Sequence, residues 1–427
     1  MKKSVKKLIA LALALAMVLT LAACGGNNGT GSSGSSNSGD SGSTNTGSDN
    51  SGSDSSSGGQ SAAVEPKKVK IGVAHYSDYG AAYEAIVAYL ESMSSTLNVE
   101  FVYATLTQTD ESANLTKIQE LIASGVDGIL CSMDMGMGAI MDECEAAGVY
   151  LAGFLADYDD SYNNNYDMVF GSEYFLGTVA DGPITPENRR GDDFAASLIE
   201  YNDAHPDERI THVAMTMFPG WAFPTAPINV QQFIDAIDEY NAANPENAIT
   251  VDPLDEASDV LMFTNVDSTY FSKHSGIQAI IAFNAGQFVF PTMVSAGVEK
   301  DIKLFCSGWN DGDEQNFGSH GTGTYQSTVV CATESINYPL VLLLNKLNGV
   351  EFSDQPAEAE RVSCVSYIIN SDEDLARFER NVYLTGDAKD AIYTPEDVLN
   401  MTAFGNPNAT YADLVETLNH MTIDDLK

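Results

Sequence analysis

The stretch 118–138, IQELIASGVDGILCSMDMGMG, decides the fold because it contains one complete change from helix to strand. Apolar residues at helical spacing predict a helix over Glu111–Ser124, and Gly125 stands where that helix should end. The uncharged run Gly128–Ser132 is typical of a strand that is buried on both faces. A second helix is predicted over Ala139–Ala147, so the stretch indicates a strand flanked by helices.

The same alternation continues on both sides of this stretch. Further strands are predicted at Val69–Ala74, Val99–Ala104, Val149–Phe154 and Met168–Gly171, with a helix over Ala81–Met93. Strands that are separated by helices of this length belong to a parallel sheet, because a parallel pair needs a long crossover connection. The fold class is therefore α/β, with helices on both faces of the sheet.

A second series of strands and helices follows an irregular, proline-containing stretch at Gly182–Arg190. Its predicted strands are Ile210–Met215, Ala248–Val251, Ile277–Phe283, Ile302–Ser307 and Thr324–Val330, and its predicted helices are Ile228–Tyr240, Ser258–Ser272, Phe288–Ala296 and Ser335–Leu347. The last portion, Arg361–Lys427, opens with a strand-like run at Val362–Ile369. About 350 residues of this kind exceed what one core usually covers, so two lobes are expected.

The N-terminal segment is predicted to be an export signal. Four lysines, at positions 2, 3, 6 and 7, precede the apolar run Leu8–Leu21, which is short for a membrane-spanning helix. Leu21-Ala22-Ala23-Cys24 resembles the lipobox of bacterial lipoproteins, which implies that Cys24 carries a lipid and becomes the mature N-terminus. The alternative is an ordinary secreted protein, but the glycines that follow Cys24 also fit the lipoprotein pattern.

The segment 24–63 is predicted to be an unfolded tether, because it is nearly all Gly, Ser, Asn, Thr and Asp. A flexible coil of this length spans on the order of 35 Å. The folded part is then expected outside the cell, lipid-anchored to the cell membrane, on the outer face of a Gram-positive membrane. Loss of residues 1–23 leaves 16 of the 20 Lys and Arg against all 60 Asp and Glu, a net charge of −44 that excludes nucleic acid as a partner.

The sequence favours neither a metal nor a catalytic function. Besides Cys24 there are five cysteines, at positions 131, 144, 306, 331 and 364, without paired CxxC spacing. Several lie in apolar runs, so we expect buried small residues, although one disulfide remains an alternative. The six histidines are scattered, and none of the common nucleophile, zinc or phosphate-binding motifs is present. We expect no cofactor, no metal and no enzymatic activity.

Several fragments, in this order and spacing, resemble the type 1 periplasmic binding proteins, the sugar-binding family that also supplies the sensor lobes of LacI-type repressors. The fragments are Val69–Val73, Ile118–Gly138, Ala146–Val149, Phe170–Glu173 with Leu176-Gly177, Ile277–Asn284 and Leu304–Asp311. The resemblance implies two Rossmann-like lobes with parallel sheets, joined by a multi-strand hinge and closing on a solute. The expected domains are 64–172 completed by about 331–358, 173–330 with about 359–380, and a C-terminal extension at 381–427.

The candidate ligand-binding residues follow the predicted strands, because ligands of open parallel sheets bind beyond the carboxyl ends of the strands. Carboxylates and amides can take the hydroxyl groups of a neutral polyol in pairs, and aromatic rings can cover its C–H faces. The candidates are Asp78, Tyr79, Asp134, Asp157, Trp221, Phe223, Asn229, Asn284, Trp309, Asn310 and Asp311. Alternatives stay open: Asp78 could cap a helix, Trp309 could belong to the core, Asp157 could lie in a solvated turn, and His75 is expected to have only a local partner.

Departures from the family pattern leave the ligand open. The arginines that sugar binders of this family carry after the fourth strand and near Asn229 are missing, and Val330 or Cys331 replaces the hinge glutamine, so we expect a pocket without a fixed cation. The predicted function is capture of a small neutral solute, a carbohydrate first, by a monomer that delivers it to an ABC permease. The alternatives are a sensing lipoprotein for a membrane kinase, and a binder of nucleosides or another neutral solute.

Overall fold

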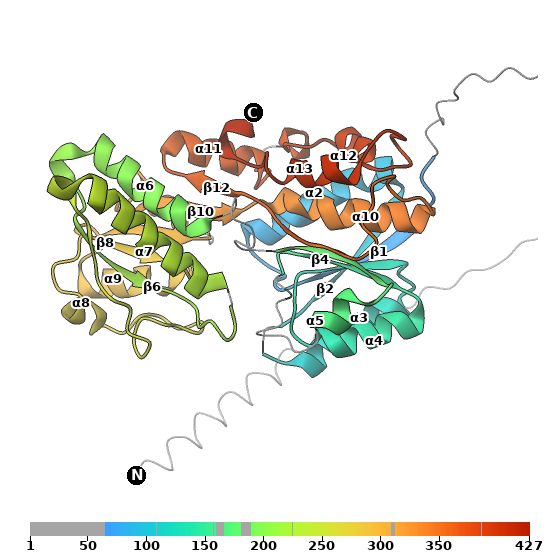
Figure 1. Cartoon of the computed structure of the whole chain (residues 1–427), viewed down its shortest axis with the longest axis horizontal. Coiled ribbons are helices and arrows are strands. Elements are labelled where there is room, and N and C mark those ends of the chain that lie inside the picture. The colour runs from blue at the N-terminus through green and yellow to red at the C-terminus, as the bar shows by residue number, and fades with distance from the viewer. Residues whose placement is uncertain are drawn as a thin grey trace, which may run out of the picture. The chain divides into compact units, whose positions relative to one another are not determined.

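The computed structural model describes residues 65–107, 109–156, 158, 166–180, 189–223, 225–308, 312–385 and 387–427. The predicted signal peptide and tether lie outside these residues, as do Cys24, Asp157 and 309–311. The described residues form two six-stranded sheets with helices on their faces (Figure 1). Nowhere in these ranges does a helix combine the length and the apolar composition needed to cross a bilayer.

The first sheet has the strand order β11-β5-β4-β3-β1-β2, and all of its pairs are parallel. Buried residues of α2 and α10 cover one face, and those of α3, α4 and α5 cover the other. The elements of this unit are β1 (Val69–His75), α2 (Ala81–Leu97), β2 (Val99–Thr105), α3 (Glu111–Ala123), β3 (Gly128–Cys131), α4 (Met137–Ala147), β4 (Tyr150–Phe154), α5 (Tyr166–Phe170), β5 (Phe175–Ala180), α10 (Asn337–Asn348) and β11 (Arg361–Ser363).

The second sheet has the order β12-β10-β9-β8-β6-β7, parallel except for β12, which runs antiparallel to β10. Apolar residues of α6 and α7 pack together on one face. The elements of this unit are α6 (Arg190–Ala204), η1 (Pro206–Glu208), β6 (His212–Thr216), α7 (Thr225–Ala243), η2 (Pro245–Asn247), β7 (Thr250–Val251), α8 (Tyr270–Lys273), β8 (Ala279–Ala282), η3 (Gly286–Phe288), α9 (Phe290–Ala296), β9 (Lys303–Ser307), η4 (Asp313–Asn316), β10 (Tyr325–Cys331), η5 (Thr333–Ile336) and β12 (Ser366–Ile369).

The predicted α/β architecture is confirmed, while some of its elements differ from the prediction. The predicted strand Met168–Gly171 is wrong, because these residues end helix α5, and the fifth strand is β5. Since β5 pairs with β4, the first sheet continues beyond residue 172, where we expected the first lobe to end. Helix α6 was not predicted at all, although its apolar residues have helical spacing.

The predicted helix Ser258–Ser272 is also wrong, since only its last residues are helical, in α8. Tertiary hydrogen bonds override the local pattern here. The amide of Leu261 donates to the carbonyl of Met217 over 2.8 Å, and the amide of Val266 donates to the carbonyl of Phe288 over 2.8 Å. These bonds hold the segment against the ends of other elements, so its backbone cannot form a helical ladder.

The chain crosses between the two units more than once. The crossings lie between β5 and α6, between β10 and α10, and between β11 and β12. The predicted single strand Val362–Ile369 is in fact two strands, β11 in the first sheet and β12 in the second. A multi-strand connection of this kind is what the family resemblance implied.

The C-terminal extension packs on elements of the first unit. It follows α11 (Asp372–Asn381) and consists of η6 (Ala388–Asp390), α12 (Pro395–Met401), α13 (Tyr411–Thr417) and η7 (Ile423–Asp425). The hydroxyls of Tyr338 and Tyr411 lie 2.8 Å apart, and the amide of Ala403 donates to Oδ1 of Asn345 over 2.9 Å. Leu414, Leu418 and Met421 are buried in the same core cluster as α2 and α10, so the extension is part of the folded core.

Candidate functional site

In the first unit, the carboxyl ends of β1 and β3 are tied together. The amide of Tyr76 donates to Oγ of Ser132 over 3.0 Å. Asp78 and Tyr79 are exposed beyond β1, and Asp134 is half-buried beyond β3. The alternative role for Asp78 as a helix cap is wrong, because Gly80 is the N-cap of α2 and no side chain caps it. Asp78 and Tyr79 thus extend into solvent at this sheet edge.

His75, the last residue of β1, is buried at the same edge. Its Nδ1 lies 2.9 Å from the carbonyl oxygen and 3.0 Å from the amide nitrogen of Ser77, the local partner that we expected. Its ring stacks on Tyr76 and lies 5.9 Å from that of Phe154. Burial lowers the pKa of His75 to about 4, although its hydrogen bond to Ser77 opposes this shift, so the ring is neutral at pH 7.

In the second unit, two predicted amide side chains are buried with unused hydrogen-bonding capacity. Asn284 follows β8, and its Oδ1 accepts a hydrogen bond from Oγ1 of Thr216 at the end of β6 over 2.8 Å. Nδ2 of Asn284 and Oδ1 of Asn229, on α7, are buried atoms without a hydrogen-bond partner among the described residues. An unpaired buried amide group costs about 1–3 kcal/mol, which favours a ligand or water at both atoms.

Backbone strain occurs at a strand end of each sheet. Ala285, next to Asn284, has φ 118° and ψ 143°, a conformation that is nearly restricted to glycine. Leu155, the residue after β4, has φ 50°. Strained residues at the ends of two strands are typical of functional sites, where the surrounding packing enforces the conformation.

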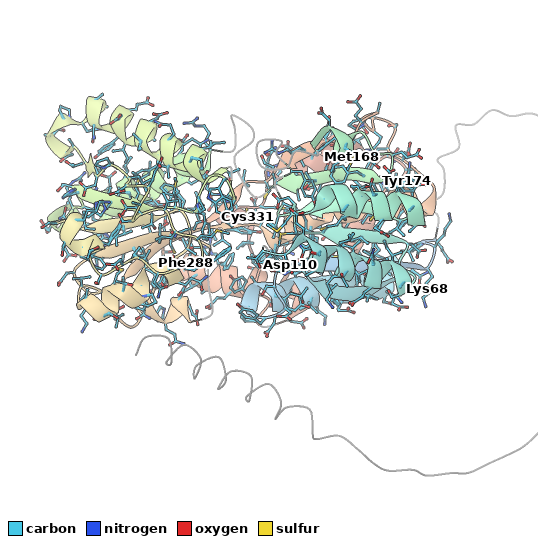
Figure 2. The ribbon with its side chains drawn as sticks, turned by 90° about the horizontal axis from the view of Figure 1, so that it is seen from below. Lys68, Asp110, Met168, Tyr174, Phe288 and Cys331 are labelled. Carbon is cyan, nitrogen blue, oxygen red and sulfur yellow. The ribbon has the colours of Figure 1, made fainter. Side chains whose placement is uncertain are left out.

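Four phenylalanine rings, here called the phenylalanine cluster, gather beside this edge of the second sheet. They are Phe218, Phe223, Phe263 and Phe288; the last is labelled in Figure 2. The rings of Phe218 and Phe223 are stacked with centroids 4.3 Å apart. Trp221, in the same loop, is 65% exposed. The sequence identified only Phe223 and Trp221, although Phe218 and Phe288 also follow strands; Phe263 lay in a predicted helix.

A buried cation, Arg190, lies at the carboxyl end of β10. The Nη2 atom of Arg190, the first residue of α6, lies 2.6 Å from Sγ of Cys331, and its Nε donates to Oγ of Ser366 over 3.1 Å. Cys331 is labelled in Figure 2. Sequence analysis missed Arg190 because it placed the residue at the end of an irregular stretch. The apolar residues of α6 recur at helical spacing, and this pattern could have indicated the helix.

The described cysteines are free thiols, and they are buried except for the half-buried Cys331. Burial raises the pKa of the Cys131, Cys144 and Cys306 thiols to about 12, so they are protonated at pH 7. Within the described ranges, no three His, Cys, Asp or Glu side chains are grouped so that they could hold a metal ion.

A cavity of about 530 Å³ lies within the C-terminal extension, between α12, α13 and Lys427. None of the predicted site residues lines it. Its carboxylates already have partners, since Asp397 accepts from Thr394 and Asp413 accepts from Thr410. The unpaired amide of Asn284 and the strained residues Leu155 and Ala285 follow strands instead, so we take these strand ends as the candidate site.

Two α/β units of this topology, joined by several crossings, constitute the periplasmic binding protein type 1 fold. Among solved structures, the chain is similar to an ABC transporter solute-binding protein from Actinobacillus succinogenes with bound D-allose, at 11% identity and a TM-score of 0.53 over 72% of this chain and 99% of that one. It is also similar to the 5-methylthioribose transporter solute-binding protein from Thermotoga lettingae, at 13% identity and a TM-score of 0.50 over 83% and 97%.

A further similar structure is an ABC transporter solute-binding protein from Burkholderia graminis in complex with D-arabinose, at 12% identity and a TM-score of 0.50 over 73% of this chain and 98% of that one. No protein-family model matches the chain. No curated protein matches it either. At these identities the likeness establishes the fold, and the ligand has to be argued from the residues.

Proposed function

We propose that this protein is an extracytoplasmic solute-binding lipoprotein that captures a small neutral solute, a carbohydrate, between its two lobes and delivers it to an ABC permease. The observation that carries the proposal is the pair of buried amides, Asn229 on α7 and Asn284 after β8, whose Oδ1 and Nδ2 atoms have no hydrogen-bond partner among the described residues. The fold supports it, because the similar structures include sugar-binding transport proteins.

These residues suit a sugar better than an ion. Nδ2 of Asn284 can donate a hydrogen bond to a hydroxyl group, and Oδ1 of Asn229 can accept one, so the two amides together offer both kinds of bond. The phenylalanine cluster and Trp221 offer apolar faces for the C–H surfaces of a pyranose or furanose ring. Asp78, Tyr79, Asp134 and Asp157 would contact the solute from the first lobe after closure, and residues 309–311 would contact it from the second. Binding of this kind requires no catalytic group, so we propose a binding protein and not an enzyme.

The remaining parts of the proposal concern the location of the protein. Cys24 would carry the lipid, and segment 24–63 would tether a monomer to the outer face of the membrane, within reach of the permease.

The phenylalanine cluster favours a second candidate ligand, a nucleoside, because a base can stack on aromatic rings. A receptor that presents the closed form to a membrane kinase would use the same closure.

A thermal-shift screen of the full-length protein tests the proposal. The panel contains pentoses, hexoses, oligosaccharides, nucleosides and amino acids. A solute that binds only the native state at a hundredfold excess over its Kd stabilises the protein by about 2.7 kcal/mol, so at least one sugar should raise the melting temperature. A response to nucleosides alone would replace the carbohydrate by the second candidate, and a response to charged amino acids alone would contradict the proposal.

Two substitutions locate the site. Asn284→Ala and Trp221→Ala should each abolish the shift while the protein remains folded. Asn202→Ala is the matched control, because Asn202 is a buried amide that bonds to Ile210 at the opposite end of β6. This control should lower the melting temperature but keep the response to the sugar. If both site variants respond like the wild type, the assignment of the site is wrong.

A further inference from the structure

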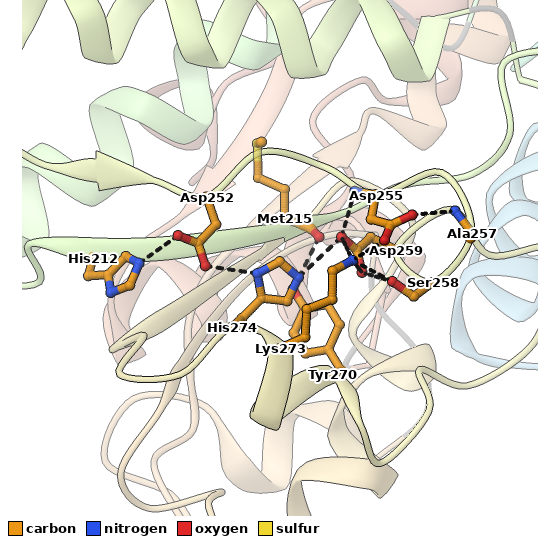
Figure 3. A network of polar contacts seen from close by, with 10 residues as sticks. All are labelled: His212, Met215, Asp252, Asp255, Ala257, Ser258, Asp259, Tyr270, Lys273 and His274. Carbon is orange, nitrogen blue, oxygen red and sulfur yellow. Dashed lines mark hydrogen bonds and ion pairs between the residues drawn. The ribbon is translucent and has the colours of Figure 1, made fainter.

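His75 differs from the other buried histidine, His274, in the use of its ring nitrogens. His274 is 3% exposed and has a carboxylate at each nitrogen, with Oδ2 of Asp252 2.8 Å from Nδ1 and Oδ2 of Asp259 3.1 Å from Nε2 (Figure 3). His75 is 1% exposed, and its Nε2 has no hydrogen-bond partner among the described residues. A buried polar atom without a partner is rare in folded proteins, so Nε2 of His75 calls for a ligand or an ordered water.

The ring of His75 is held in one orientation while Nε2 stays available. The ring centroids of Tyr76, Tyr83 and Phe154 lie 4.2, 5.4 and 5.9 Å from that of the imidazole. Ser77 contacts Nδ1 alone, with its carbonyl oxygen at 2.9 Å and its amide nitrogen at 3.0 Å. The local partner of His75 therefore accounts for one ring nitrogen and leaves the other without a bond.

Both neutral tautomers of His75 make Nε2 useful to a hydroxyl group. With the proton on Nδ1, the ring donates to the carbonyl of Ser77, and Nε2 offers a lone pair. With the proton on Nε2, Nδ1 accepts from the amide of Ser77, and Nε2 offers a donor. A hydroxyl group can donate and accept, so it fits either tautomer. Because burial lowers the pKa of His75 to about 4, the ring is uncharged at pH 7 and does not attract an ionic ligand.

His75 lies at the edge of the first sheet where ligands of open parallel sheets bind. It ends β1, which lies between β3 and β2, so it is at the carboxyl end of an inner strand. The neighbouring ring of Phe154 ends β4, and Leu155 directly after it has the strained φ of 50°. Asn284 occupies the corresponding place after β8 in the second sheet, and it also has a buried nitrogen without a partner among the described residues.

We propose that His75 is a ligand-binding residue of the first lobe, whose Nε2 forms a hydrogen bond with a hydroxyl group of the solute. The inference rests on the proposed function, because it takes the solute to be a sugar or the ribose part of a nucleoside. Asn229 and Asn284 bind other groups of the solute from the second lobe. A solute hydroxyl at Nε2 satisfies a buried atom that would otherwise lack a partner, so loss of either the hydroxyl or Nε2 weakens binding.

Two substitutions of His75 in the full-length protein separate the two ring nitrogens. The amide of Asn reaches the position of Nδ1 and leaves nothing at Nε2, whereas the longer amide of Gln reaches the position of Nε2. The probes are D-allose, D-glucose, D-galactose, D-arabinose, D-ribose and adenosine, and titration calorimetry measures Kd. For each probe that the wild type binds, His75→Asn should raise Kd about tenfold, and His75→Gln should raise it less than about threefold.

Single-deoxy analogues of the bound probe give a readout that a merely structural role would not change. The wild type should bind one analogue about tenfold more weakly than the parent probe, because Nε2 then lacks its partner. His75→Asn should bind this analogue and the parent probe equally, since the two losses concern the same bond.

His212→Asn is the matched control, because the same substitution is made at a strand end far from the candidate site. His212 begins β6 at the amino end of the second sheet and bonds to Asp252 (Figure 3). This variant should keep the wild-type Kd for the probe and for every analogue. Melting temperatures are recorded for all variants, so that a loss of folding is not mistaken for a loss of binding.

If His75→Asn does not fold, NMR of wild-type protein with ¹⁵N-labelled histidine decides. The bound probe should then shift the Nε2 signal of His75, assigned by its absence in His75→Gln, more than the Nδ1 signal. The inference is overturned if His75→Asn binds like the wild type, if each deoxy analogue loses equal affinity in both proteins, or if the Nε2 signal does not move. Water is then the partner of Nε2, and the proposed function still stands. If the wild type binds no probe, the proposed function itself fails, and this inference fails with it.

Discussion

Among single residues, those of the turn after β8 combine three features that are typical of a binding site. Asn284 is buried with an unpaired Nδ2, Ala285 has a backbone conformation that suits glycine, and Gly286 lies against Tyr325. An L-residue at φ 118° costs of order 1–3 kcal/mol. Packing around Asn284 and Gly286 must supply this energy, because nothing local favours the conformation.

This turn predicts two opposite stability changes. Ala285→Gly should raise the free energy of unfolding by about 1 kcal/mol, since relief of strain exceeds the entropy that glycine adds to the unfolded chain. Gly286→Ala should lower it by about 1–3 kcal/mol, because the new Cβ would lie 2.3 Å from Cε1 of Tyr325. Urea unfolding measures both. A loss of stability in Ala285→Gly would show that the conformation carries no strain.

The sequence could identify Asn284 but not its surroundings. Asn284 follows an apolar strand, and that position alone places it at the carboxyl edge. Its bond to Thr216 joins residues that are 68 positions apart, and only the register of β6 against β8 brings them together. The contact between Phe263 and Phe218 depends on tertiary pairing in the same way. The partners of Arg190, Cys331 and Ser366, are likewise distant in the sequence, and no local pattern indicates them.

Among the secondary-structure elements, the sequence correctly predicted those whose own residues determine their structure. The strands β3 and β8 are apolar throughout, β1 is apolar except for Lys70 and His75, and their burial on both faces follows from that pattern. The predicted helix Ser258–Ser272 is wrong because hydrogen bonds of this segment go to Met217 and Phe288. Tertiary partners of this kind override helical spacing.

Helix α12 belongs to the packed C-terminal extension, and a capping box forms its N-terminus. This cap can be tested by substitution. The amide of Asp397 donates to Oγ1 of Thr394 over 3.2 Å, and the amide of Thr394 donates to Oδ2 of Asp397 over 2.9 Å. Thr394→Ala should lower the free energy of unfolding by about 1 kcal/mol, whereas Thr394→Ser should keep most of it. Urea unfolding compares the three proteins. Equal losses of unfolding free energy in both variants would show that the hydroxyl group of residue 394 does not stabilise the helix.

Two buried titratable groups, His75 and Glu334, change the stability of the whole molecule with pH in opposite directions. Burial lowers the pKa of His75 to about 4, so the unfolded chain binds its proton first and stability falls as the pH drops from about 6.5 to about 4. Burial raises the pKa of Glu334 to about 7, only partly offset by its hydrogen bond from Tyr367. The native state then holds the extra proton, so stability falls as the pH rises from about 4.5 to about 7.

Glu334→Gln should separate these two effects. Gln resembles the protonated carboxyl, so the variant should match the wild type near pH 4.5 and exceed it at pH 8 by up to about 3 kcal/mol, the value of a shift of this size. Urea unfolding at both pH values measures the difference, and Glu145→Gln, at an exposed position of α4, should change stability equally at both. If Glu334→Gln changes stability by the same amount at pH 4.5 and pH 8, the carboxyl of Glu334 does not titrate in this range.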